Sequence, residues 1–254
     1  FLQFITDCYQ IIGGIMRWEI ILFCVLGGYL WGSLSLARIV THFVAPGKDL
    51  NQIELRHAQS GETLKVKTVG ATTASVVLGP KYGGMIGILD IFKGAIPTLI
   101  LRLVFPDQPY FLFLGTAIVI GHIFPLYFGF KGGGGLSPAL GTLLVLDPLG
   151  VIVCILVAFM VGMFVFKNIA FAIMGGPVLF IIWVAIRTGN WIYIVFSIII
   201  NLLLVIAVIP DVGAYLKAKK AGKAELSGAL DTIPMGQMMN KMMRRMGITS
   251  EKED

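Results

Sequence analysis

The sequence predicts an all-α membrane protein with about seven transmembrane helices, and three observations lead to that fold class. Hydrophobic residues make up 57% of the 254 residues and charged residues only 13%, and the mean hydropathy is +0.87. A water-soluble domain of this length needs many more charges to cover its surface. Apolar runs long enough to cross a bilayer recur along the chain, and a helix satisfies its own backbone hydrogen bonds there. Basic residues, finally, concentrate in alternate loops.

Hydropathy places seven apolar segments along the chain. They are 18–40, 83–105, 110–129, 136–146, 149–166, 169–187 and 191–209. Segment 136–146 is shorter than the ~20 residues that cross a bilayer straight, so it is either a half-span or part of a longer bent segment continued across Asp147-Pro148. With seven passes, most of the 20 Lys and Arg residues and the motif loops lie on one side, which the positive-inside rule makes cytoplasmic.

Composition divides the chain into three parts. Residues 1–17 are expected to form an N-terminal interfacial or helical segment, 18–210 a polytopic transmembrane domain, and 211–254 a basic cytoplasmic tail. The KAKK and KMMRRM clusters of the tail fit a cationic face near anionic lipid, and a plain basic tail with disorder explains them as well. The three cysteines are scattered, so they indicate neither a disulfide framework nor a metal site.

Several polar residues stand inside the apolar segments, where they are costly and tend to mark function. Asp90 and Lys93 are three residues apart, hence on one helical face, and can neutralise each other. They form either a structural ion pair or part of a site. His122 and, more weakly, Ser33 give the same kind of signal, although a lone buried histidine is more often a packing group. All four are expected near the basic side of the membrane.

Two glycine-bearing segments are predicted on that same side. They are VGATTASVVLG at 69–79 and KGGGG at 131–135. Glycine-rich backbone exposes N–H groups that can converge on an anion, and Lys131 supplies a compact positive charge. Neither segment has the spacing of a P-loop or of a dinucleotide-binding turn. The pattern therefore predicts a phosphate site at the end of a helix bundle.

Three ordered motifs, spread over residues 18–210, resemble those of a known family. They are GSLS (32–35), TVGATTASVVLG (68–79) with DIFKG (90–94), and GHIFP (121–125) with FKGGGG (130–135). Their order is similar to that of the bacterial membrane glycerol-3-phosphate acyltransferases that use acyl phosphate as donor. The pattern of that family is G-S-x-P, then N-x-G-A-T-N-x-x-R-x-x-G with D-x-x-K-G, then G-H-x-F-P with F-K-G-G-K-G.

The resemblance implies a seven-span fold with a site at the cytoplasmic face. The implied reaction moves a fatty acyl group from acyl phosphate to the 1-hydroxyl of glycerol 3-phosphate, giving lysophosphatidic acid for phospholipid biosynthesis. The implied partners are these two substrates and membrane lipids, without cofactor, metal or nucleic acid, in the inner (plasma) membrane. The expected catalytic residues are His122, Ser33, Lys93 and Asp90, and the expected phosphate-binding residues are Lys131, Gly132, Gly133, Gly135, Gly70, Ala71 and Thr72.

Within that resemblance, Lys93, held by Asp90, is expected to contact a second anion, and His122 and Ser33 to handle hydrogen bonds or protons. The chain departs from the family pattern at several positions: Gly134 replaces a lysine, Val76 an arginine, and Thr68 and Thr73 two asparagines. Two alternatives therefore stay open. One is a non-catalytic relative that binds lipid or a membrane partner. The other is a transporter. The gathering of the polar residues on one side of the membrane argues against it.

Overall fold

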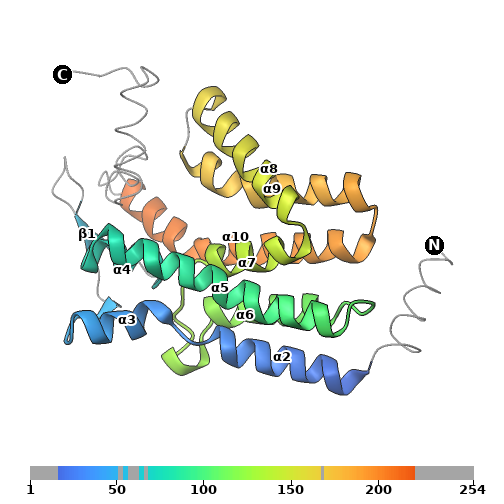
Figure 1. Ribbon diagram of the computed structural model, residues 1–254. Coiled ribbons are helices and arrows are strands. Elements are labelled where there is room, and N and C mark those ends of the chain that lie inside the picture. The colour runs from blue at the N-terminus through green and yellow to red at the C-terminus, as the bar shows by residue number, and fades with distance from the viewer. Residues whose placement is uncertain (1–16, 51–53, 57–62, 66–67, 167–168, 221–254) are drawn as a thin grey trace.

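The structure of the protein is a computed structural model that describes residues 17–50, 54–56, 63–65, 68–166 and 169–220 (Figure 1). The α-helices are α2 (Trp18–Gly32), α3 (Leu36–Val44), α4 (Ala71–Leu78), α5 (Pro80–Val104), α6 (Tyr110–Ile123), α7 (Leu136–Leu146), α8 (Pro148–Met160), α9 (Ile169–Thr188) and α10 (Trp191–Lys220). A 3₁₀ turn, η3 (Leu126–Phe128), follows α6, and a π-helical turn, η4 (Val161–Val165), extends α8. Two antiparallel strands, β1 (Glu54–Arg56) and β2 (Thr63–Lys65), form a short hairpin.

The helical membrane class is confirmed. Among the described residues, six helical segments are long and apolar enough to cross a membrane, and α7 is a shorter apolar helix. Asp147 is extended, with φ −153° and ψ 96°, so α7 and α8 are two separate helices. The count of seven complete passes stays a prediction, as does the predicted three-part division of the chain. Residues 1–16 and the KMMRRM cluster lie outside the described residues, and the predicted boundary at 210 falls inside α10.

The elements that carry the predicted motifs gather at one end of the bundle. Figure 1 shows α3, α4 and β1 at the end where α10 finishes, while α2 begins at the opposite end. α5 and α6 run between the two ends and bring their own motif residues to the same region. The described parts of the motif segments that sequence analysis assigned to the basic side therefore lie together.

Glycines let the helices that carry the site approach backbone to backbone. A Cβ at Gly32 of α2 would overlap the carbonyl of Ile118 in α6, and one at Gly94 of α5 would overlap the carbonyl of Pro138 in α7. Gly141 of α7 lies equally close to the backbone of α5. Small residues at helix contacts are typical of membrane bundles, where packing and hydrogen bonds hold the helices together. These contacts join α2 to α6 and α7 to α5.

A polar cluster fastens the α7–α8 junction to α9 at the opposite end. The Asp147 carboxylate caps α8 by accepting from the Gly150 amide at 3.0 Å, and it also accepts from Trp183 Nε1 at 3.0 Å. Nη1 of Arg187 lies 2.7 and 2.8 Å from the two carboxylate oxygens. Burial raises the pKa of Asp147, but the hydrogen bonds from Trp183 and Gly150, with the Arg187 charge, outweigh it and hold the pKa below its usual value.

The glycine contact between α5 and α7 predicts a stability difference between two identical substitutions. Gly94→Ala should lower the free energy of unfolding by about 1–3 kcal/mol, because its methyl group has no space against Pro138. Gly84→Ala, in the same helix, meets nothing within 4 Å and should leave stability unchanged or slightly higher. Melting temperatures in detergent measure both; equal losses would refute the close-contact account.

The lowered pKa of Asp147 predicts a pH dependence of stability. A carboxyl group whose pKa is lower in the folded state stabilises the fold at pH values above its unfolded-state pKa of 3.8. That contribution is lost as the pH falls through the lower folded-state pKa. Wild-type protein should therefore lose its stability advantage over Asp147→Asn below about pH 4. Melting temperatures of the two proteins between pH 7 and pH 3 test this expectation, and an advantage that persists at the acid limit would contradict it.

Candidate functional site

A buried ammonium group organises the predicted site. Lys93 Nζ lies 3.1 Å from the Gly32 carbonyl, 2.9 Å from the Leu34 carbonyl and 3.1 Å from His122 Nδ1. The Asp90 carboxylate lies one helical turn away, with Oδ1 3.2 Å from Nζ. The side chains of Lys93 and Asp90 are 3% and 2% exposed, so their charges compensate each other away from water. Lys93 thereby joins α5 to the end of α2 and to α6.

This contact sets the tautomer of His122. Because an ammonium group has only donors, we infer that Nδ1, which lies 3.1 Å from Lys93 Nζ and 3.6 Å from Asp90 Oδ1, accepts from Lys93 and that Nε2 carries the ring proton. The Nε2 side of the ring faces the glycine loop, because a Cβ at Gly133 would overlap that nitrogen. His122 therefore presents a fixed N–H donor at the loop while its other nitrogen is held by Lys93.

Ser33 joins α2 to the turn after α6. Its Oγ donates to the Tyr29 carbonyl at 2.8 Å and accepts from the Leu126 amide at 3.2 Å. The side chain is fully buried, between the two residues whose carbonyls hold Lys93. The structure thus gives Ser33 a bridging position beside the ion pair.

The glycine loop folds back over the end of α6. The Gly133 amide donates to the His122 carbonyl at 3.1 Å, and the Val69 amide donates to the Gly132 carbonyl at 2.7 Å. A Cβ at Gly132 would overlap the His122 carbonyl, so only glycine allows this approach. The glycines therefore allow close packing, and the N–H of Gly133, in a loop whose amides were expected to be exposed to an anion, is bonded to His122 instead.

Two helices begin where the glycine segments meet. α4 starts at Ala71 and α7 at Leu136, and a Cβ on Gly70 would lie 3.6 Å from the Cα of Gly133. Gly135 caps α7 with φ +76°, a left-handed conformation that favours glycine. Helix N-termini carry unpaired amides and the positive end of the helix dipole. The convergence of two of them can bind an anion.

Arg38 is a site residue that sequence analysis missed. Its Nη2 donates to the Lys131 carbonyl at 2.6 Å and its Nη1 to Ser35 Oγ at 3.3 Å. The guanidinium also lies 4.6 Å from the centre of the Phe128 ring, in a cation–π contact. A charge inside the predicted span 18–40 was the signal that could have found it. Arg38 fastens the start of the glycine loop to α3 and brings a second cation there.

The structure places the predicted residues in three groups. One compact group contains Ser33, Asp90, Lys93, His122, Gly70, Gly132 and Gly133. Ala71 and Gly135 lie at the two helix starts. Lys131 and Thr72 are exposed at the rim.

The predicted roles of these residues stay predictions. The three donors of Lys93 all have protein acceptors, so a contact with a second anion requires one of them to be released. Across the described part of the chain, no group of three or more His, Cys, Asp or Glu is placed to hold a metal ion.

Comparisons with known proteins show which family this chain resembles. The family model described as glycerol-3-phosphate acyltransferase matches residues 22–218. A glycerol-3-phosphate acyltransferase of Aquifex aeolicus is 38% identical over 128 residues, which cover 50% of this chain and 60% of the relative. One of Myxococcus xanthus is 37% identical over 125 residues, 49% of this chain and 59% of the relative. These matches thus span less than two thirds of the length of either relative.

Solved structures extend the match to most of the fold. A crystal structure of PlsY (YgiH), an integral membrane glycerol 3-phosphate acyltransferase, in its glycerol 3-phosphate form has 28% sequence identity and a TM-score of 0.62. The match covers 81% of this chain and 94% of that one. The lysophosphatidic acid form gives a TM-score of 0.63 and covers 84% and 97%.

The loop geometry predicts opposite outcomes at neighbouring glycines. Gly133→Ala should abolish stabilisation by inorganic phosphate, because the methyl group displaces His122 Nε2 from the loop. Gly134→Ala should retain it, since a Cβ there meets nothing within 4 Å. The shift in melting temperature with added phosphate is the measurement, and equal shifts for the two variants would contradict the placement of His122.

Proposed function

The chain belongs to the glycerol-3-phosphate acyltransferase family, and from that premise we propose that it transfers a fatty acyl group from acyl phosphate to the 1-hydroxyl of glycerol 3-phosphate. The product is lysophosphatidic acid, for phospholipid biosynthesis. One observation supports this most directly: two helix N-termini converge on a glycine loop beside a fixed histidine N–H. Such a site suits two substrates that both carry phosphate.

The chemistry asks for positioning and charge stabilisation more than for covalent catalysis. Acyl phosphate is an activated mixed anhydride: the hydroxyl oxygen forms a bond to the acyl carbon as the bond from that carbon to the phosphate oxygen breaks. The α4 and α7 N-termini, with Lys131 and Arg38, are suited to hold the phosphates and to stabilise the leaving phosphate. These groups would act without a protein nucleophile.

His122 is proposed as a donor in this reaction. With Nδ1 accepting from Lys93, its Nε2 carries a proton and cannot remove one from the attacking hydroxyl. The hydroxyl proton then passes to a phosphate oxygen, an acceptor that both substrates bring. Lys93, paired with Asp90, holds the Nδ1 side of His122. Ser33 holds the end of α2 through its hydrogen bonds to Tyr29 and Leu126. His122 would donate to a phosphate or to the developing carbonyl oxygen.

The protein is a multi-pass membrane protein, and its proposed location is the inner (plasma) membrane with the basic end in the cytoplasm. Glycerol 3-phosphate would then reach the site from the cytoplasm and the acyl chains from the bilayer. The concentration of basic residues in the loops at that end supports the orientation.

A second candidate function is a non-catalytic relative that binds lipid or a membrane partner. Two substitutions favour it: Gly134 and Val76 stand where the family pattern has cations, and a lost cationic contact to a desolvated phosphate costs about 1.5–3 kcal/mol. Arg38 compensates in part, because it brings positive charge to the same loop.

Phosphate release from acyl phosphate by the purified protein tests the proposal. We expect release that depends on glycerol 3-phosphate and falls about a hundredfold in Lys131→Ala, which loses a charge at the leaving phosphate. Lys48→Ala is the matched control, since Lys48 is exposed and donates to Val77 rather than to the glycine loop. If folded protein released no phosphate from acyl phosphates of several acyl-chain lengths, the acyltransferase proposal would fail, and a non-catalytic relative would be the better explanation.

A further inference from the structure

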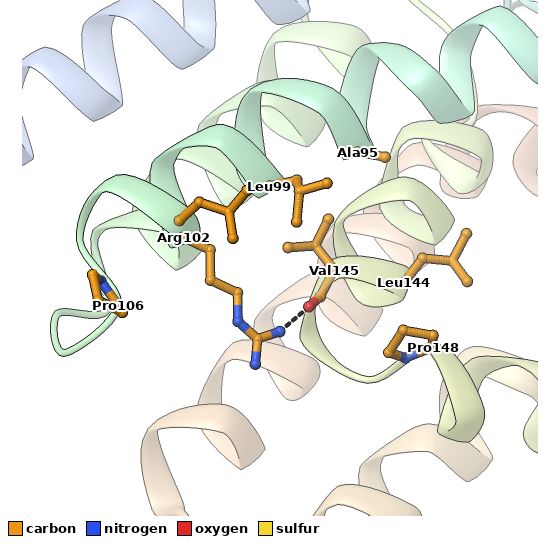
Figure 2. A pocket seen from close by; sticks show the side chains of 8 residues that line it. Ala95, Leu99, Arg102, Pro106, Leu144, Val145 and Pro148 are labelled. Atoms are coloured by element: carbon orange, nitrogen blue, oxygen red, sulfur yellow. Dashed lines mark hydrogen bonds between the residues drawn. The ribbon is translucent and has the colours of Figure 1, made fainter.

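α5 and the α7–α8 junction line a hollow. The backbones of α5 and α7 are in close contact where Gly94 meets Pro138 and Gly141 meets Ile91. Towards the end opposite the glycine loop lies a hollow of about 670 Å³ (Figure 2). Ala95, Leu99 and Arg102 line it from α5, and Leu144, Val145 and Pro148 line it from the α7–α8 junction. Its volume is within the range of ligand sites, about 300–1,000 Å³.

Arg102 is the charged group of this hollow. Its Nη1 donates to the carbonyl of Val145, as Figure 2 shows, and to that of Leu146 at 3.1 Å. These contacts satisfy the last carbonyls of α7 and hold the guanidinium at the hollow, where its other N–H groups have no described acceptor. The guanidinium also lies 5.3 Å from the centre of the Phe111 ring.

Among the residues that the structure describes, no ion pair joins Arg102 to a carboxylate, whereas Arg17, Lys93 and Arg187 each pair with one. A half-buried cation in the last turn of a membrane helix, beside apolar side chains, is complementary to an anionic group that carries a hydrocarbon chain.

We propose that this hollow binds a phospholipid of the surrounding bilayer. The lipid phosphate accepts hydrogen bonds from the free N–H groups of Arg102, whose planar fork suits phosphate. One acyl chain lies along Ala95 and Leu99 towards Leu144. Arg102 is nine positions beyond Lys93, about 13 Å along α5, so this site is separate from the candidate active site and does not depend on the proposed reaction.

Native mass spectrometry of the full chain in detergent tests the proposal, with phosphatidylglycerol as probe and diacylglycerol of the same chains as its phosphate-free counterpart. Wild-type protein should retain one phosphatidylglycerol and bind diacylglycerol at least tenfold more weakly, because a charge-assisted contact is lost. Arg102→Gln should weaken retention of phosphatidylglycerol by a similar factor. Arg17→Gln is the matched control, since Arg17 is an exposed arginine near the same end and pairs with Glu19 outside the hollow.

A second variant, Leu99→Trp, separates loss of lipid binding from a folding defect in Arg102→Gln. The larger side chain fills the hollow, while the contacts of Arg102 with α7 stay in place. This variant should also lose the lipid. Equal retention of diacylglycerol, or unchanged retention in both hollow variants, would overturn the proposal. The proposal would also be overturned if the wild-type protein were a dimer and Leu99→Trp made it monomeric. A second copy of the chain, and not a lipid, would then occupy the hollow.

Discussion

The buried ammonium group of Lys93 is the interaction on which the rest of the site depends. Carbonyls at the end of α2, the Asp90 carboxylate and the His122 ring surround it, so one side chain links three helices. Burying a charge is expensive unless it is paired and hydrogen-bonded, and Lys93 meets both conditions. Removing it would strand the Asp90 charge, at a cost of about 3–5 kcal/mol. Lys93 thus links the helices and also determines which ring nitrogen of His122 carries the proton.

The surrounding backbone is arranged around that link. Glycines bring α2 and α7 close to their neighbours and let the loop 131–135 lie directly on the end of α6. This leaves two helix N-termini facing one place, with Arg38 and Lys131 beside them. A reaction of an activated acyl phosphate needs fixed donors more than a nucleophile, and the site offers fixed donors. The opposite end holds separate polar anchors, at Asp147 and Arg102.

Sequence patterns could predict most of the helices and several of the polar residues that the structure groups together, but not their contacts. The predicted segments at 110, 136 and 191 begin where α6, α7 and α10 begin, because a long apolar run has no other stable form in a bilayer. The end of α10 at Lys220 was missed, since the helix continues into polar sequence beyond the apolar signal. Asp90 and Lys93 stood out as charges within a span. Lys93 donates to a carbonyl of α2, and Arg38 donates to the Lys131 carbonyl. Both contacts join segments that are distant in the sequence, so local patterns do not predict them.

The tautomer of His122 tests this account most directly. Nitrogen-15 NMR of protein with labelled histidine, assigned by comparison with His122→Gln among the three histidines, reports which ring nitrogen carries the proton. The account predicts a neutral ring protonated at Nε2, with Nδ1 shifted as a hydrogen-bond acceptor, and loss of that acceptor shift in Lys93→Met. A ring protonated at Nδ1, or a spectrum that does not respond to Lys93→Met, would contradict it.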